Sequence, residues 1–509
     1  MTFSLYQKPN RKNLIILFVA AFLIRAATFH FYVQHCERYK QPDTPDYHNC
    51  AIGVACGTGM HRPDTMQPIF WRTPGYPLYL SWFYNWFGLK TSKFSENKAA
   101  QTAAIWTQIG LSSLLPLLIF FLVLFLTGVL PIAWLTAWIF VFHIGMVLAS
   151  TYLLTEALSL LFFMPFLLFF YKSFRTYAEP TQKNRWVLYT ILAAGSLGIA
   201  TWIRPMGEFI SIVAAIIILL LARKNSPSVD GPVRRSLGVD GLKHKLKQIG
   251  LFFLVFFIVT SGWYIRNYNI TGKLFFCPMF GPYLNSFCAP KILRDTTHMT
   301  LKQSISRLYK QARAESAREA IRAHARGKKE CKELCALKIA IPILKKHPWI
   351  FIRDWIKEVL KTTFDLHSHI FVGFVKNCFW YDPLEEFLTE KWVDCVYKQP
   401  MPLTMRLLIF LEIIFSILKW IGLLIGAWMF LCIPILRRFK ISEKNKQLFS
   451  LWLKVSPVIG AILFMTGGFG YARLRLPVDP LMVMLSLTCW FYLLRKGKRY
   501  EKDVRAMED

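Results

Sequence analysis

The chain has 509 residues, of which 54% are hydrophobic, 16% are aromatic and only 18% are charged. Apolar runs of about 20 residues, the length that a helix needs to cross a bilayer, recur along the whole sequence. This composition excludes an ordinary soluble enzyme, a disordered chain and a fibrous repeat. The net charge of +32 comes from Lys and Arg in the loops between apolar runs, and no nucleic-acid-binding motif accompanies it. We therefore predict an all-α polytopic membrane protein that contacts membrane lipids and no nucleic acid.

The apolar runs predict about ten transmembrane helices with both termini cytoplasmic, because basic residues crowd loops 172–185 and 222–250. An apolar patch at 76–87 is too short to span and should lie in the interface or form a re-entrant segment. The predicted spans are 14–32, 105–126, 130–148, 153–170, 187–203, 209–221, 251–265, one within 407–435, 451–465 and 478–494.

The spans divide the chain into three regions. Residues 1–265 form an N-terminal transmembrane module with a long outside loop at 33–100, and residues 403–509 form C-terminal spans and a cytoplasmic tail. Between them, 266–402 is a basic and mostly helical region outside the membrane. Its stretch 291–346 has 15 Lys and Arg against five acids. Helical spacing from Leu301 to Ala312 indicates either a solvated amphipathic helix or a surface for anionic lipid headgroups or a phosphorylated acceptor glycolipid.

Nine of the 11 cysteines fall in the two outside regions, where disulfides are permitted. Pairings cannot be deduced from sequence, but three staples are reasonable. They are Cys36 with Cys50 or Cys56, Cys277 with Cys288, and Cys378 with Cys395.

Three carboxylates at the outer membrane surface are candidates for chemistry. Asp43 and Asp46 lie three residues apart in the first outside loop, and a partly desolvated carboxylate there can act as a general base. An aspartate beside prolines is also a common turn or helix-cap residue. Glu156, after Thr155, is either part of a helix N-terminus or a second acid that faces the same cavity.

Five arginines are predicted at the outer ends of spans: Arg72, Arg204, Arg266, Arg473 and Arg475. Arginines in this position commonly snorkel or meet lipid phosphate. Because several unconnected segments deliver them to one face, they could also grip the phosphate of a lipid-linked substrate. No acid lies at the centre of a predicted span, so an ion-relay pathway lacks its usual signature.

The motifs around these residues resemble a known family. Asp43-x-x-x-Tyr47-x-x-x-Ala51 and Arg72-Thr73-Pro74-Gly75-Tyr76-Pro77 resemble the first periplasmic loop of GT-C class glycosyltransferases. The resemblance is to enzymes similar to dolichyl-phosphate-mannose protein mannosyltransferases and lipid A aminoarabinose transferases. Further motifs recur in order at 154–156, 203–205, 263–268 and 473–477.

The resemblance implies a GT-C-like helical bundle whose catalytic module is 1–265. It implies a hexosyl- or pentosyltransferase that moves a sugar from a polyprenyl-phosphate donor to a lipid, glycan or protein acceptor, with inversion. The site would face outward from a bacterial inner membrane. No cofactor is certain, and a divalent metal between Asp43 and Glu156 stays open.

The resemblance also implies roles for single residues. Asp43 would be the general base or orient the acceptor, and Glu156 corresponds to the second acidic position. Arg72 falls where a basic residue meets the donor phosphate. The commoner family pattern has no second acid at the position of Asp46, so this residue leaves open which of the two aspartates is the base. The other four arginines are secondary phosphate candidates.

Two readings from other classes stay open. A secondary transporter or lipid flippase would need inverted repeats and broken helices, and no repeated segment is found. A noncatalytic scaffold would use these charges as caps and lipid contacts, and predicts that Asp43 is dispensable.

Overall fold

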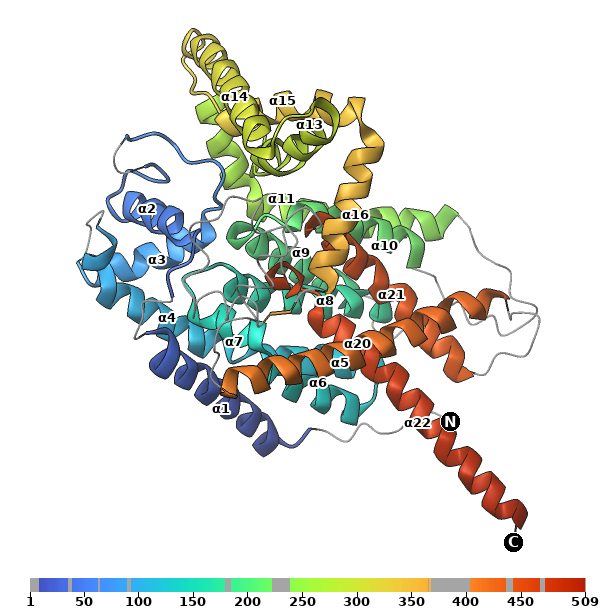
Figure 1. Ribbon diagram of the computed structural model, residues 1–509. Helices are drawn as coiled ribbons and strands as arrows, with labels where there is room; N and C mark the ends of the chain where they lie inside the picture. Colours follow the sequence, from blue (N-terminus) through green and yellow to red (C-terminus); the bar gives the residue numbers. More distant parts are fainter. Residues whose placement is uncertain are drawn as a thin grey trace.

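The structure is a computed structural model, and it describes residues 9–34, 39–62, 65–88, 93–178, 185–221, 239–364, 366–367, 403–435, 443–466 and 472–508. Within these ranges the chain forms helices joined by loops, and its one β-bridge joins His61 to Pro68. The prediction of an all-α polytopic membrane protein is confirmed (Figure 1).

The helices fall into an N-terminal half, an outside group and a C-terminal group. The first comprises α1 (Arg11–Thr28), η1 (Phe29–Val33), α2 (Thr44–Ala55), α3 (Gly75–Trp86), η2 (Phe94–Asn97), α4 (Lys98–Ser112), α5 (Leu115–Thr127), α6 (Leu130–Phe142), α7 (Ile144–Thr151), α8 (Glu156–Ala178), α9 (Arg185–Ile203), α10 (Gly207–Leu221) and α11 (Val239–Thr271). The outside group comprises α12 (Phe280–Tyr283), η4 (Leu284–Cys288), α13 (Ala289–Thr297), α14 (Leu301–His324), α15 (Lys332–Lys346) and α16 (Pro348–Phe364). The last comprises α20 (Leu403–Ile435), α21 (Glu443–Thr466), η6 (Ala472–Arg475) and α22 (Asp479–Glu508).

Seven helices in the described ranges are long and apolar enough to cross a bilayer, and the bent pair α6 and α7 makes an eighth. Two shorter apolar helices, Gly207–Leu220 and Asp479–Leu494, coincide with the remaining predicted spans. All ten predicted spans therefore match apolar helices in position, although length and composition alone support seven or eight.

The third predicted span is not one straight helix. It bends by 50° between α6 and α7. His143 at the break has an extended backbone, and its side chain accepts a hydrogen bond from the backbone N–H of Met146 at 3.3 Å. An imidazole that caps the new helix thus replaces one of the backbone hydrogen bonds that a continuous helix would make.

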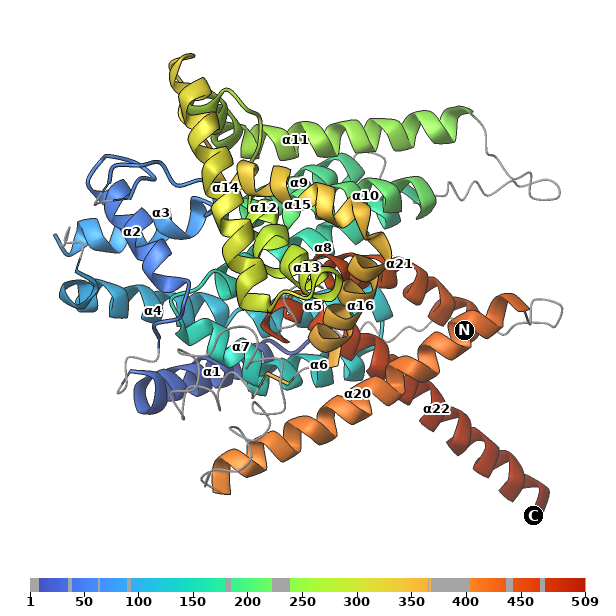
Figure 2. The ribbon, with the colours of Figure 1, turned by 45° about the horizontal axis from the view of Figure 1, so that its top comes forward.

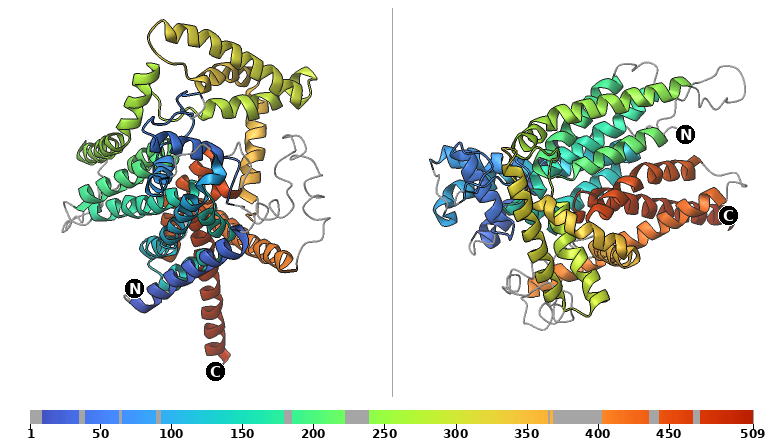
Figure 3. Two further views of the ribbon diagram at one scale, coloured as in Figure 1. Left: turned by 90° about the vertical axis from the view of Figure 1, so that its left-hand side faces the viewer. Right: turned by 90° about the horizontal axis from the view of Figure 1, so that it is seen from above.

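The spanning helices run side by side, and α14 crosses their direction (Figures 2 and 3). The main apolar core lies among α1, α5, α6, α8 to α11 and α20 to α22. A second apolar core lies among α2, α3, α4 and α7. The predicted amphipathic helix is confirmed as α14, whose N-terminus has a capping box formed by Thr300 and Gln303.

The predicted disulfide between Cys277 and Cys288 is wrong, because both are free thiols. The Cys277 thiol donates instead to the carbonyl of Trp71 at 3.3 Å. Cys36, Cys378 and Cys395 lie outside the described residues, and so do the pairings that involve them.

Candidate active site

Asp43 sits directly before α2, at the N-cap position that its sequence context suggests. Its carboxylate nevertheless makes no capping hydrogen bond. One oxygen accepts from Nη2 of Arg72 at 2.8 Å, and the other accepts from Nη2 of Arg473 at 2.9 Å. Asp43 thus occupies the cap position with a helical backbone, and its side chain pairs with two arginines from distant segments.

Arg72 joins both aspartates of the first outside segment. Its Nε and Nη2 donate to Oδ2 of Asp46 at 3.1 Å and 2.8 Å. The same oxygen also accepts from the indole of Trp71 at 3.1 Å. The guanidinium lies over the ring of Tyr47, 4.9 Å from its centroid. These contacts hold a buried guanidinium in one orientation.

The loop that carries Arg72 is fixed to the end of α9. The hydroxyl of Thr73 donates to the carbonyl of Ile203 at 2.8 Å. A Cβ added to Gly75 would lie 2.7 Å from the backbone of Trp202, so only glycine permits this approach. The Thr-Pro-Gly sequence therefore brings Arg72 close to the segment that continues into Arg204.

Glu156 is the first residue of α8 and is buried. Its Oε1 accepts from Nη1 of Arg204 at 2.9 Å and lies 3.5 Å from Nε of Arg473. Its Oε2 has no hydrogen-bond partner among the described residues. The start of α8 is fixed to the first outside segment, because the hydroxyl of Thr44 donates to the carbonyl of Leu153 at 3.3 Å.

Six of the eight predicted site residues thus form one continuous chain of ion pairs, which we call the outer ion network. Its order is Asp46, Arg72, Asp43, Arg473, Glu156 and Arg204. Three carboxylates balance three guanidiniums. The side chains of Asp43 and Asp46 are 30% and 38% exposed, whereas that of Arg72 is 9% exposed. A ligand would therefore reach the network from the side of the aspartates.

The arginines of the network determine the charge state of Asp43. Burial alone would raise the pKa of this carboxyl group, but Arg473 and Arg72 lower it to about 2 by charge and hydrogen bonding. Asp43 is therefore ionised at neutral pH. In turn, Glu156 and Asp43 raise the pKa of Arg473, against the opposing effect of burial.

The position between Asp43 and Glu156 is taken by a cation that the chain itself supplies. Arg473 donates to Asp43 at 2.9 Å and approaches Glu156 at 3.5 Å. Both oxygens of Asp43 are also engaged by guanidinium groups. In this arrangement the two carboxylates do not fit a divalent metal, since a metal there would meet Arg473.

Arg266 lies apart from the outer ion network. Its guanidinium donates to the carbonyls of Ile69 and Met60, both at 3.1 Å, and lies over the ring of Trp263 at 4.4 Å. It connects α11 to the backbone of the first outside segment. In the described residues it therefore positions the loop before Arg72 rather than contacting the aspartates.

Arg475 also lies apart, in a second group of charges that we call the buried cluster: His143, His367, Lys419, Arg475 and Asp479. Nε of Arg475 donates to Asp479 at 2.8 Å, and Nη1 donates to the carbonyls of Thr362 and Thr363. Arg475 is 2% exposed, so a donor phosphate would not reach it without rearrangement.

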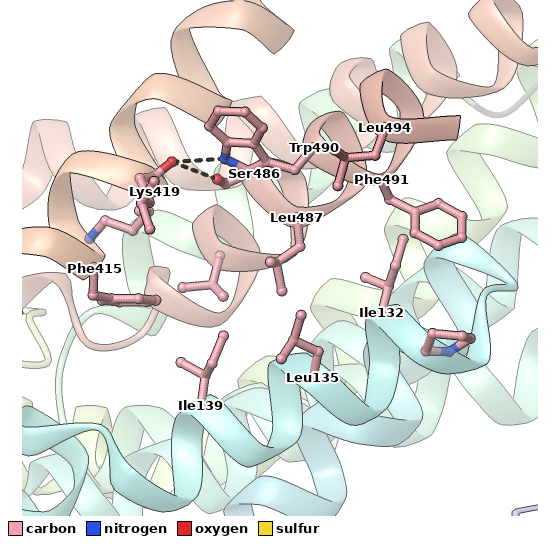
Figure 4. Close-up of a pocket in the computed structure, with 13 residues that line it drawn as sticks. Ile132, Leu135, Ile139, Phe415, Lys419, Ser486, Leu487, Trp490, Phe491 and Leu494 are labelled. Atoms are coloured by element: carbon pink, nitrogen blue, oxygen red, sulfur yellow. Dashed lines mark hydrogen bonds between the residues drawn. The ribbon is translucent and has the colours of Figure 1, made fainter. Parts of the chain in front are cut away.

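Four members of the buried cluster were not predicted. Lys419 lies within an apolar span, and an ionisable residue there is a signal for a buried partner. Its ammonium is 3.5 Å from Asp479 and turns away from the apolar cavity of about 430 Å³ between α6, α20 and α22 (Figure 4). The imidazoles of His143 and His367 have no spacing that would have linked them to Asp479 in the sequence.

The cluster includes a His143, His367 and Asp479 group with the spacing of metal ligands. However, Arg475 is 2.8 Å and Lys419 is 3.5 Å from the same carboxylate. Two cations already compensate Asp479, so a divalent ion would be repelled.

Part of the chain matches the model of a known protein family. Residues 79–269 match the family model of dolichyl-phosphate-mannose-protein mannosyltransferase. This segment includes Glu156 and Arg204 of the outer ion network, and Arg266. A comparison with curated proteins gives no match.

Several solved structures are similar at low identity. The archaeal oligosaccharyltransferase AglB from Archaeoglobus fulgidus, in complex with an inhibitory peptide and a dolichol-phosphate, has 14% identity and a TM-score of 0.48 over 97% of this chain and 51% of that chain. The same organism's enzyme tethered to an acceptor peptide has 12% identity and a TM-score of 0.49, over 96% and 51%. ArnT from Cupriavidus metallidurans bound to undecaprenyl phosphate has 12% identity and a TM-score of 0.37, over 93% and 78%.

The chain spans about half the length of the archaeal oligosaccharyltransferase chains. Similarities this low assign no role to any residue of this chain. The family model confirms, over residues 79–269, that this chain resembles the dolichyl-phosphate-mannose-protein mannosyltransferases, as its sequence motifs predicted.

Proposed function

We propose that the protein is a membrane glycosyltransferase that moves a single hexosyl or pentosyl unit from a polyprenyl-phosphate donor to an envelope lipid, glycan or protein. The observation that carries this proposal is the position of Asp43 between Arg72 and Arg473, at 2.8 Å and 2.9 Å. The candidate base, Asp43, is thus in direct contact with two arginines that could bind the donor phosphate. The match to the mannosyltransferase family model supports the same class of reaction.

Donor binding would exchange one set of ion pairs for another. A phosphate group can accept bidentate hydrogen bonds from guanidinium, and it would replace the carboxylates of Asp43 and Asp46 that accept from Arg72 in this structure. As the phosphate engages Arg72 and Arg473, those arginines would stabilise the Asp43 carboxylate less. The pKa of Asp43 would then rise from about 2 toward its ordinary value, which makes it a better base.

The transfer itself would be a single displacement. The acceptor oxygen or nitrogen forms a bond to the anomeric carbon while the bond from that carbon to the phosphate oxygen breaks, which inverts the configuration. The acceptor proton goes to Asp43, and polyprenyl phosphate leaves with the bonding electrons. Arg72 and Arg473 would stabilise the charge on the leaving phosphate.

Glu156 offers the second acidic function. Its Oε2 is buried and lacks a hydrogen-bond partner among the described residues, which is costly unless a ligand completes it. A sugar or acceptor hydroxyl would supply that hydrogen bond. In this proposal Glu156 orients a substrate, while Arg204 keeps it ionised through the contact at 2.9 Å.

We place the enzyme in a bacterial plasma membrane with both termini cytoplasmic and the outer ion network on the external face. Basic residues in the loops at the opposite ends of the spans support this orientation.

The test measures released polyprenyl phosphate from protein in nanodiscs, with polyprenyl-phosphate sugars and acceptor extract from the host envelope. We expect Asp43→Asn to reduce turnover by about 10²- to 10⁴-fold, the usual contribution of a general base. Asp46→Asn is the matched control, since it removes a neighbouring carboxylate paired with the same Arg72. It should lower turnover much less.

Full turnover in correctly folded Asp43→Asn protein would overturn the assignment of the base. If no donor binds or reacts with wild-type protein, the transferase proposal itself is wrong, and a lipid transporter becomes the better candidate.

A further inference from the structure

The outside region has a positively charged surface that the proposed reaction does not explain. On α14 all six Lys and Arg side chains are exposed, and we call them the α14 basic face: Lys302, Arg307, Lys310, Arg313, Arg318 and Arg322. The helix lies at the edge of the molecule, crosswise to the spanning helices (Figures 1 and 2). Its outer side therefore faces away from the bundle.

The acids of α14 neutralise only a small part of this face. Glu319 is buried and pairs with Lys273 at 2.8 Å and with Lys338 at 3.5 Å, while Arg322 of the face reaches it at 3.9 Å. Glu315 is mostly covered and lies 3.6 Å from Lys338 and 3.8 Å from Arg318. Both carboxylates are therefore shared with cations outside α14, and they lie beside only two of the six basic residues of the face.

Four members of the face have no acidic partner in the part of the chain that the structure describes. They are Lys302, Arg307, Lys310 and Arg313, and all four are exposed. Unpaired basic groups spread over one helix face produce a strong local potential that attracts several negative charges at once.

The positive charge continues toward the outer ion network. After α14 come the exposed Arg326, Lys329 and Lys332. The ammonium of Lys332 donates to the side chain of Gln67 at 3.5 Å, in the first outside segment. Five residues earlier in that segment, Arg62 lies over the ring of Trp71 at 5.0 Å. Trp71 is the residue whose indole donates to Asp46.

The α14 basic face is better suited to bind an anion in solution, or one that projects from the membrane, than to insert into the bilayer. A helix that lies in a membrane interface normally presents a broad apolar face with large side chains. The outer side of α14 has only two large exposed hydrophobic residues, Tyr309 and Ile321. Most of this side is therefore unsuited to insertion among lipid chains.

We propose that the α14 basic face binds the acceptor, and that the acceptor is a polyanion with several phosphate or carboxylate groups. This inference rests on the proposed glycosyl transfer and names its acceptor class. The charged face captures the anionic part of the acceptor, and the basic path through Lys332 and Arg62 leads its reacting group toward Asp43.

The first experiment measures binding and needs no turnover. Full-length protein in nanodiscs of neutral phosphatidylcholine is titrated with fluorescent inorganic polyphosphate. Wild type should bind with an affinity that falls steeply with salt, since counterions are released. The triple variant Lys302→Gln, Lys310→Gln, Arg313→Gln should bind about tenfold more weakly or worse and show a shallower salt dependence.

The matched control removes three exposed basic groups from the opposite ends of the spans: Lys12→Gln, Lys243→Gln and Lys247→Gln. It should bind polyphosphate like wild type. Equal binding by the α14 triple variant and wild type would overturn the proposal. The same titration in nanodiscs that contain phosphatidylglycerol tests whether the face binds the bilayer instead. If the α14 substitutions change polyphosphate binding only when this anionic lipid is present, the face binds the bilayer and the proposal is wrong.

The second experiment links the face to the reaction. Transferred sugar label is followed into envelope acceptor fractions separated by anion exchange. We expect the label in the anionic fractions with wild type, and at least about tenfold less with the α14 triple variant. Label in neutral fractions, or unchanged labelling by the variant, would refute the inference. No transfer by wild type together with intact polyphosphate binding would instead refute the transferase.

Discussion

Two groups of charges meet at η6, and they differ in what surrounds them. Arg473 belongs to the outer ion network and its side chain is 29% exposed, whereas Arg475 belongs to the buried cluster and its side chain is 2% exposed. Residues two apart on a 3₁₀ helix point to different sides, so one short turn serves both groups. The outer network is open enough for a ligand to replace its partners, whereas the buried cluster is enclosed by protein.

The cost of losing one charge should therefore differ between the groups. In the outer network, water or a ligand can solvate a carboxylate that loses its arginine. In the buried cluster, Asp479 would remain fully buried with fewer cations. Breaking a buried ion pair from one side is far more costly than breaking a surface pair.

The largest expected effect is on stability in the buried cluster. Arg475→Ala should lower the free energy of unfolding by about 3–5 kcal/mol, because it leaves Asp479 under-compensated and two carbonyls without donors. Thermal unfolding of purified protein in one detergent measures this loss. Arg473→Ala is the control and should cost about 1 kcal/mol or less. Equal losses of unfolding free energy in the two variants would contradict the distinction between an exposed and a buried group of charges.

The next effect concerns donor binding in the outer network. Arg473→Ala should raise KM for the polyprenyl-phosphate sugar by roughly 10- to 100-fold, as expected for a lost charge-assisted hydrogen bond. Arg473→Lys should recover part of the affinity, because it keeps the charge but not the bidentate fork. Steady-state kinetics over a donor series provide the values. An unchanged KM in Arg473→Ala would mean that this arginine only pairs with Asp43.

The smallest expected effect is a pH dependence of the stability that the outer ion network contributes. Since the pKa of Asp43 is lowered to about 2 in the folded protein, its ion pairs stabilise the fold above about pH 4 and lose this contribution as the pH falls toward 2. With its partial exposure, the contribution is about 1 kcal/mol.

Melting temperatures of wild type and Asp43→Asn, measured between pH 6 and pH 3, check this sign. Wild type should lose part of its advantage over this range as the solution becomes more acidic. A difference that stays constant over this range would show that the arginines do not stabilise the ionised form.

Much of the site was predictable because charged residues at the outer ends of apolar runs must share one membrane surface. Asp43, Arg72, Glu156 and Arg204 each lie near such an end, so the predicted topology places them on the same face. The topology did not show that Arg473 and Arg475 belong to different groups of charges. It also did not show that Arg266 hydrogen-bonds to the backbone of the first outside segment. These differences depend on side-chain direction, which no hydropathy pattern contains.

The sequence by itself determined the all-α membrane architecture, the positions of the apolar helices and which charges lie near their ends, because bilayer thickness and the cost of burying charge act locally along the chain. Only the tertiary structure decided which charges pair. Asp43 and Arg473 are 430 residues apart and meet at 2.9 Å. His367 and Asp479 meet at 2.9 Å in the interior without any shared motif. Such contacts arise when packed helices bring distant segments together, and their strength depends on burial that exists only in the folded protein.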